Sequence, residues 1–166
     1  MINWYKKVVF ENYTNFSGRA RRSEYWYFAL MNLIIAIITA IIDKSLGLKF
    51  GTNTIYSLAV FIPGLAVAVR RLHDIGKSGK LLLLFYVIII VLAIVMVFSG
   101  ISVFMSGVSP SSMSSLGIGF FIPLLLIVAI AIWMLVLFFT NGDSGSNKYG
   151  ADPKSNGEEI NEIGTE

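Results

Sequence analysis

The stretch LLLLFYVIIIVLAIVMVFSGI, from Leu81 to Ile101, decides the fold class of this chain. It contains no charged side chain, and a helix of about 20 apolar residues is long enough to cross the roughly 30 Å hydrocarbon core of a bilayer. Across all 166 residues, 55% are hydrophobic and 14% are charged. Soluble domains usually hold about 45–50% apolar and about 25% charged residues. The composition therefore predicts a membrane protein.

Three further apolar stretches surround this one, and together they predict spans at about 25–42, 55–72, 81–101 and 118–140. The first opens on an aromatic cluster, Tyr25 to Phe28, typical of a membrane interface. The second contains Pro63-Gly64, where we expect a kink. We predict an all-α, polytopic four-helix bundle, with residues 1–154 as a single integral membrane domain and 155–166 as a polar, disordered tail.

The lead before the first span is amphipathic and lacks the pattern of a cleavable signal peptide. Apolar side chains recur at helical spacing, at Ile2, Tyr5, Val8, Val9, Tyr13 and Phe16. This spacing predicts an interfacial helix on the membrane surface, and an irregular tail is the alternative.

The distribution of Lys and Arg predicts the orientation. Eleven of the 13 basic residues lie in the N-terminal lead, in the loop of residues 70–80 and in the C-terminal tail. By the positive-inside rule both termini face the cytoplasm, as in a multi-pass protein of the bacterial inner membrane. Nine acidic residues share that side, so we expect no nucleic-acid interface. With no cysteine and one histidine, we expect neither a metal site nor a cofactor.

Three polar motifs carry the informative residues, and all fall on the predicted cytoplasmic side. The first two are GRARRSEYW, from Gly18 to Trp26, and RRLHDIGKSG, from Arg70 to Gly79. We predict a juxtamembrane binding site for an anionic lipid headgroup, a small anion or a partner protein. Its candidate residues are the following charged side chains: Arg19, Arg22, Glu24, Arg70, Arg71, His73, Asp74 and Lys77.

Structural roles are the alternative for these residues. The arginines of the first motif suit orientation anchors, or partners for Glu24. Arg70 and Asp74 stand four apart and share one face of a helix. His73 suits a helix cap bonded to a neighbouring carboxylate.

The third motif runs through the C-terminal segment, where we single out Asn147, Tyr149, Gly150 and Asp152. It predicts turns that fold the tail back on the bundle, with Tyr149 at the interface. Known site patterns fail at single positions. A phosphate loop would need glycine at Arg71, and an EF-hand would need glycine at Lys148. A nucleophile elbow would need glycine at Ser146, so we expect no catalytic residue here.

The three blocks, in this order, resemble the bacterial inner-membrane family known as domain of unknown function 805, the YhaH-like proteins. The resemblance covers about Trp4 to Lys154, and it implies a small polytopic inner-membrane protein without an established activity. One departure is Ala151, where the family commonly carries proline. The motif positions that the resemblance carries over are Gly18, Arg19, Arg22, Glu24, Trp26, Arg70, Arg71, His73, Asp74, Gly79, Asn147, Tyr149, Gly150, Asp152 and Pro153.

Three functions stay open on the sequence. A non-catalytic protein that binds an anion or a partner fits the one-sided clustering of charge. A transporter or channel subunit would use a second span broken at Pro63-Gly64. An interfacial lipid-phosphate enzyme would use His73 and Asp74 as acid or base. The small-residue steps Ala36/Ala40 and Gly64/Ala68 fit packing within the bundle or a homo-oligomer seam.

Overall fold

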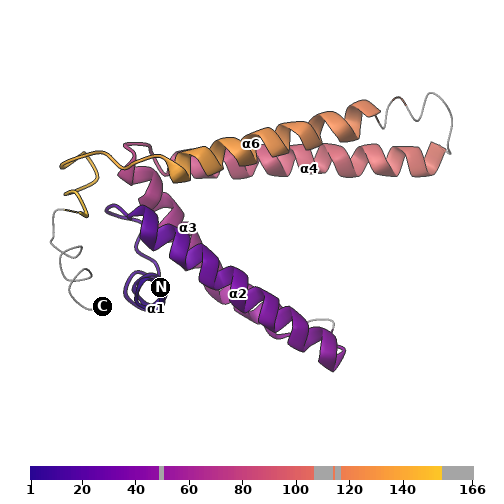
Figure 1. Cartoon of the computed structure of the whole chain (residues 1–166). Helices are drawn as coiled ribbons and strands as arrows, with labels where there is room; N and C mark the ends of the chain where they lie inside the picture. The colour runs from indigo at the N-terminus through magenta and orange to yellow at the C-terminus, as the bar shows by residue number, and fades with distance from the viewer. Residues whose placement is uncertain (49–50, 107–113, 115–116, 155–166) are drawn as a thin grey trace. The chain divides into compact units, whose positions relative to one another are not determined.

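The computed structural model describes residues 1–48, 51–106, 114 and 117–154. The elements, in chain order, are α1 (Ile2–Lys6), the π-helical turn η1 (Lys7–Glu11), α2 (Arg22–Leu46), α3 (Thr52–Asp74), α4 (Lys80–Ser106), the π-helical turn η2 (Gly117–Phe121) and α6 (Ile122–Phe139), as Figure 1 shows. Four helices are long and apolar enough to cross a membrane, which confirms the prediction of an all-α chain with four candidate spans.

The chain divides into two compact units, which are described separately. The first unit comprises Met1–Gly79 and Thr140–Glu166, and the second comprises Lys80–Phe139. The first unit holds α1, η1, α2, α3 and the C-terminal polar segment. All residues of the three polar motifs therefore belong to the first unit.

Helices α2 and α3 form an antiparallel pair in the first unit, and Asp43 closes the turn between them (Figure 1). Its carboxylate accepts hydrogen bonds from the N–H of Thr52 at 2.8 Å and of Asn53 at 2.9 Å. These N–H groups begin α3 and lack partners within the helix, so the carboxylate caps them. Helix α2 ends at Gly47, whose φ of +66° is the left-handed conformation that favours glycine.

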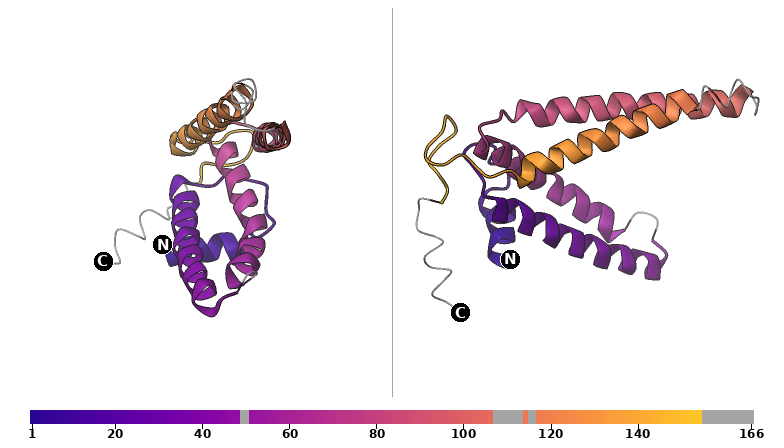
Figure 2. Two further views of the ribbon diagram at one scale, coloured as in Figure 1. Left: turned by 90° about the vertical axis from the view of Figure 1, so that its right-hand side faces the viewer. Right: turned by 45° about the horizontal axis from the view of Figure 1, so that its top comes forward.

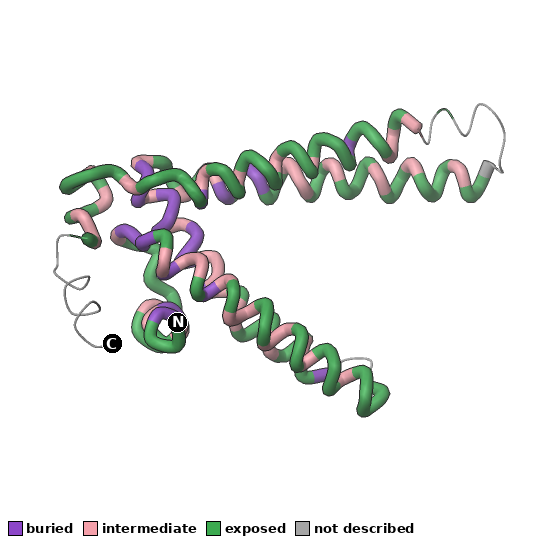
Figure 3. Tube along the Cα trace, viewed as in Figure 1, coloured by how far each residue is buried: buried purple, intermediate pink, exposed green. Residues whose placement is uncertain are grey.

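Helix α3 runs without interruption from Thr52 to Asp74, with Pro63 inside it. The break at Pro63-Gly64, on which the transporter alternative depended, is absent. Buried residues of α3 concentrate in its second half, from Pro63 onward, as the purple segments of Figure 3 show. This half carries the second polar motif into the interior of the unit.

The N-terminal helix packs across α2 and α3, as the left view of Figure 2 shows. Val8 belongs to a core cluster with Ala20, Phe28 and Val67, against which Tyr5 and Val9 also pack. At Tyr5, Val8 and Val9, the apolar face predicted for the N-terminal helix therefore packs against the protein core. The helix ends at Glu11, so Tyr13 and Phe16 lie outside it and are exposed. The position of this helix on a membrane surface stays a prediction.

A hydrogen-bonded chain of polar groups joins the same three elements. The Tyr5 and Tyr56 hydroxyls lie 3.2 Å apart, and the Tyr56 hydroxyl donates to Asn32 Oδ1. Asn32 is the strongest polar residue in the first predicted span. Its side chain is therefore bonded between helices, as polar groups in membrane bundles usually are.

The second unit consists of α4 packed on η2 and α6. Phe85 and Trp133 meet edge to face, with ring centroids 5.1 Å apart. Most other large side chains of these helices are exposed and apolar, which suits contact with lipid (Figure 3). Helix α4 extends to Ser106, five residues beyond the predicted end at Ile101. Between Ser106 and Gly117, the structure describes only Ser114.

Candidate functional site

The polar site lies in the first unit, where the start of α2, the end of α3 and the segment 140–154 meet. Six charged side chains are buried among the described residues: Arg19, Arg21, Glu24, Arg70, Arg71 and Asp74. Their exposures run from 0% for Arg71 to 9% for Arg19. Burying a charge costs several kcal/mol unless it is paired, so the contacts of each side chain matter.

Asp74, the last residue of α3, is the centre of the site. Its Oδ1 accepts a hydrogen bond from Arg19 Nε at 2.9 Å, and its Oδ2 accepts one from Arg71 Nη1. The carboxylate thus bridges the first motif to the second. The sequence placed Arg70 on the same face as Asp74, but the partner of Asp74 on its own helix is Arg71, three residues earlier.

Arg70 instead pairs with Glu24, in the first turn of α2. Arg70 Nη1 donates to Glu24 Oε1, and the two side chains are 4% and 3% exposed. The backbone carbonyl of Arg70 accepts from the Ala20 N–H at 3.0 Å, which fixes the first motif beside α3. Two other nitrogens of the same guanidinium, Nε and Nη2, are buried and have no hydrogen-bond partner among the residues that the structure describes.

Arginine side chains also hold the C-terminal segment by its backbone carbonyls. Arg19 Nη1 donates to the Gly145 carbonyl and Arg19 Nη2 to the Asp143 carbonyl. Arg21 donates from Nε to the Pro153 carbonyl at 2.9 Å, and again from Nη2. In return the Asp143 N–H donates to the Asp74 carbonyl at 2.8 Å. The third motif is therefore fastened to the other two, as the sequence predicted for a tail that folds back.

His73 takes part in this fastening through its ring and its carbonyl. The ring of Tyr149 stacks on it, with centroids 3.8 Å apart and planes 5° from parallel. His73 Nδ1 lies 3.1 Å from the Gly18 carbonyl, so this nitrogen carries the proton. Asn147 Nδ2 donates to the His73 carbonyl at 3.0 Å. The expected carboxylate partner of His73 is thus replaced by a backbone carbonyl.

Two glycines are required by the geometry of the site. Gly76 has a φ of +68° in the turn after α3, which shapes the chain reversal that the sequence predicted there. At Gly142 a Cβ atom would lie 2.1 Å from Asp74 Oδ2. The C-terminal segment therefore approaches the buried carboxylate more closely than a side chain at position 142 would allow.

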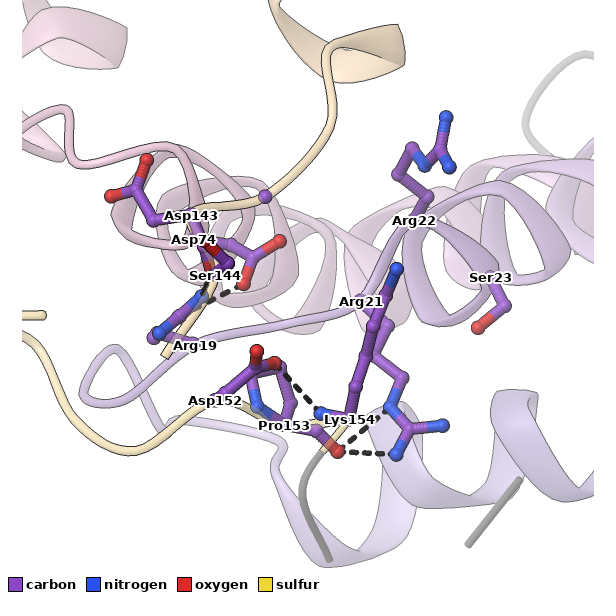
Figure 4. Close-up of a pocket in the computed structure, with 11 residues that line it drawn as sticks. Arg19, Arg21, Arg22, Ser23, Asp74, Asp143, Ser144, Asp152, Pro153 and Lys154 are labelled. Atoms are coloured by element: carbon purple, nitrogen blue, oxygen red, sulfur yellow. Dashed lines mark hydrogen bonds and ion pairs between the residues drawn. The ribbon is translucent and has the colours of Figure 1, made fainter. Parts of the chain in front are cut away.

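Two pockets open beside the buried charges. The Asp74 pocket, drawn in Figure 4, has a volume of about 270 Å³. Its charged lining residues are Arg19, Arg21, Arg22, Asp74, Asp143, Asp152 and Lys154, and its other four lining residues are uncharged. The Arg70 pocket measures about 280 Å³, and its charged lining residues are Lys7, Arg19, Arg21, Glu24 and Arg70. The Asp74 pocket has four cationic and three acidic side chains, whereas the Arg70 pocket has four cationic and one acidic. Within the described part of the chain, no three His, Asp or Glu side chains are grouped to hold a metal ion.

Comparison with known proteins assigns the family. The model of the family described as "Protein of unknown function (DUF805)" matches residues 13–151, which include the first two motifs and the third motif as far as Ala151. The chain belongs to this family. Inner membrane protein YhaI of Escherichia coli strain K12 is 38% identical over 154 residues, covering 92% of this chain and 97% of that protein. Inner membrane protein YhaH of the same strain is 43% identical over 103 residues, covering 59% of this chain and 84% of that protein. No solved structure matches the chain.

The DUF805 chain brings most of the predicted site residues together. Those in direct contact within the cluster are Arg19, Glu24, Arg70, Arg71, His73, Asp74, Asn147 and Tyr149. Arg22 and Asp152 line the Asp74 pocket, and Gly150 lines the Arg70 pocket. Lys77 is exposed and lines neither of these two pockets.

The sequence did not predict that Arg21, Asp143 and Lys7 belong with the other residues of the polar cluster and its pockets. Arg21 stands between two selected positions of the first motif, and this place in the motif was its only signal in the sequence; its burial is seen in the structure. Asp143 donates its N–H to the Asp74 carbonyl, a backbone contact that no side-chain pattern reveals, and its carboxylate accepts from Asn147 Nδ2. Lys7 lies in the N-terminal lead, outside all three motifs. Its role depends on how η1 packs, and only the fold shows this.

Acid is expected to loosen the C-terminal segment through Asp152. Its carboxylate accepts the N–H groups of Lys154 at 2.9 Å and of Gly145 at 3.1 Å, and these bonds lower its pKa below the usual 3.8. A lowered folded-state pKa means that the contribution of Asp152 is present above pH 3.8 and is lost as pH falls through the folded-state pKa. Hydrogen exchange of residues 143–154 against pH should show this loss in the wild type. Asp152→Asn should already exchange faster at neutral pH, and equal exchange in the two proteins would contradict the assignment.

Proposed function

We propose that this inner-membrane protein is non-catalytic and that its buried polar cluster binds an anionic group, carried by a lipid headgroup, a small anion or a partner protein. The proposal places both termini in the cytoplasm, because eleven of the 13 Lys and Arg residues lie on that side of the four candidate spans. The cluster would then lie where the spans meet the inner leaflet.

The imbalance of buried charge carries this proposal. Among the described residues, the buried charged side chains are four arginines and two carboxylates. Asp74 serves both Arg19 and Arg71, and Glu24 serves Arg70. Backbone carbonyls satisfy further N–H groups, but they bring partial charges only. A bound anion would lower the cost of keeping the surplus positive charge out of water.

Catalysis finds little support in the same contacts. The enzyme alternative needs His73 and Asp74 as acid or base. Both oxygens of Asp74 already accept hydrogen bonds from arginines, and Tyr149 stacks on one face of the His73 ring. The Asp74 carboxylate is thus engaged as the shared ion-pair partner of Arg19 and Arg71. The transport alternative is weakened by the continuity of α3 through Pro63.

Lys7→Ala is expected to weaken the binding of the anion, because Lys7 is a half-buried lysine that lines the more cationic Arg70 pocket. One lysine near a phosphate surface contributes about 1 kcal/mol, so retention should fall about fivefold. Native mass spectrometry of protein gently extracted from its own membrane would measure retained lipids, small anions and partner proteins.

The matched control is Lys6→Ala, which removes the same charge from the adjacent, exposed position, outside the pocket lining. This variant should retain the wild-type complement. If both variants lost the same amount of bound species, the loss would follow from the lower net charge and not from the pocket. A wild-type protein that retains no anionic species or partner would refute the proposal.

A further inference from the structure

Arg70 is the residue of the site with unused binding capacity. Its side chain is 4% exposed, and only Nη1 is bonded, to Glu24. Nε and Nη2 are buried and have no hydrogen-bond partner in the described part of the chain. A buried donor without an acceptor keeps the full cost of its desolvation, and this cost is higher when the group is charged. Buried donors in native proteins are usually hydrogen-bonded, so these two nitrogens indicate an acceptor supplied by a ligand.

The two unbonded nitrogens form one edge of the guanidinium. Nε–H and the outward Nη2–H are parallel donors, a pair that matches two oxygens of one carboxylate or phosphate. One water molecule would satisfy hydrogen bonds without offsetting the surplus of buried positive charge. An oxyanion supplies both acceptors and a full negative charge. The chemistry of the edge therefore favours an oxyanion.

The surroundings of Arg70 fit the same ligand. Arg70 lines the pocket of about 280 Å³ together with Lys7, Arg19 and Arg21, against the single carboxylate of Glu24. A change in the side-chain torsions of Arg70 would present the unbonded edge to this cavity. Its position also matters, because Arg70 lies one helical turn before the end of the candidate span α3. Span ends lie at the level of the headgroups, where lipid phosphates are the abundant oxyanions.

We propose that the Arg70 pocket binds one phosphate group, with two phosphate oxygens accepting from Nε and Nη2 of Arg70 and with Lys7 at the pocket wall. This inference rests on the proposed function and names the ligand chemistry of its site. The phosphate belongs either to a lipid headgroup or to a free phosphate ion, and the experiment below separates these sources.

Arg70→Lys tests the edge, because a lysine keeps one positive charge for Glu24 but lacks the two parallel donors. Purified full-length protein, stripped of lipid in a maltoside detergent, is titrated with inorganic phosphate in one arm and with short-chain phosphatidylglycerol in the other. Binding is measured by calorimetry and by the ligand-induced rise in melting temperature. We expect Arg70→Lys to bind about tenfold more weakly, as for the loss of about 1.4 kcal/mol from one charge-assisted pair. A response to both ligands indicates a free-phosphate site, and a response to the lipid alone indicates a headgroup site.

Glu24→Gln supplies a change in the opposite direction. Removing the carboxylate leaves the Arg70 edge in place and removes the one negative charge of the pocket lining. Binding of phosphate should therefore tighten, whereas a purely structural role of the Arg70–Glu24 pair would make both variants bind more weakly. Wild-type affinity in Arg70→Lys for both ligands, or weaker binding in Glu24→Gln, overturns the inference.

The two proposals can fail separately. If native mass spectrometry finds an anionic species or a partner that Lys7→Ala loses, while neither phosphate ligand binds to the wild type, the proposed function stands and the phosphate inference is wrong. If the wild type retains no such species and binds neither ligand, both are wrong.

Discussion

Asp74→Asn is expected to be the most destabilising single change in the polar site. The carboxylate forms ion pairs with two buried arginines, Arg19 and Arg71, and an asparagine would remove the negative charge from both pairs. Its amide would also point donor N–H groups at one of the two guanidiniums. Removing one partner of a buried ion pair costs about 3–5 kcal/mol, and here two pairs are affected. Thermal melting of the purified protein in detergent would measure the loss.

Glu11→Gln is the matched control, because it makes the corresponding change from carboxylate to amide at an exposed position. Changes of this kind at the surface usually stay within about 0.5 kcal/mol. In an Arg19→Gln background, Asp74→Asn should cost less than in the wild type, since one of its two partners is already gone. Full additivity of the two changes, or melting of Asp74→Asn at the wild-type temperature, would contradict the role of Asp74 as a shared partner.

The four spans could be predicted from the sequence because hydrophobicity is a local property. The stretch from Leu81 to Ile101 is apolar on every side, and α4 contains all of it. The ends of the spans were less predictable. Helix α3 begins at Thr52, before the predicted Ile55, because Asp43 from the preceding helix caps its first N–H groups. Such a cap comes from tertiary contact and leaves little trace in hydropathy.

That these charged residues lie close together could be expected from the sequence, whereas their pairing could not. Charged residues group at the ends of candidate spans because membrane interiors exclude them. Their partners depend on how α2, α3 and the C-terminal segment meet. Arg70 and Asp74 share a helix face at a spacing of four, yet Glu24 of α2 lies closer to Arg70 and Arg19 reaches Asp74. Contacts between elements thus replaced the local pairing.

The C-terminal segment explains why the structure uses so many arginines. Residues 140–145 have no regular hydrogen-bonded structure of their own, so their carbonyls need donors from elsewhere. Arg19 donates hydrogen bonds to the carbonyls of Asp143 and Gly145, and Arg71 donates one to the carbonyl of Thr140. A guanidinium has five N–H donors and can bond a carboxylate and carbonyls at once, which lysine cannot do with the same geometry. The same property leaves the edge of Arg70 available for a ligand.

Gly142→Ala is expected to release this segment from the site. The new Cβ would lie 2.1 Å from Asp74 Oδ2 and 2.7 Å from Asp74 Cγ, a separation that real atoms do not tolerate. The carboxylate cannot move aside without breaking its bonds to Arg19 and Arg71, so the segment must move instead. That movement would break the Asp143 N–H bond to the Asp74 carbonyl. Overpacking of this kind costs about 1–3 kcal/mol.

Alanine substitutions at two other glycines serve as controls for Gly142→Ala. Gly145 has a φ of +75° and open space around a Cβ, so Gly145→Ala should cost only the backbone strain, about 1 kcal/mol. Gly100 lies within α4 with open space, and Gly100→Ala should be neutral or stabilising by up to about 1 kcal/mol. Limited proteolysis and hydrogen exchange of residues 140–154 should therefore rank the variants with Gly142→Ala the most labile and Gly100→Ala the least. If Gly145→Ala released the segment more than Gly142→Ala, backbone conformation rather than the close approach to Asp74 would hold the third motif in place.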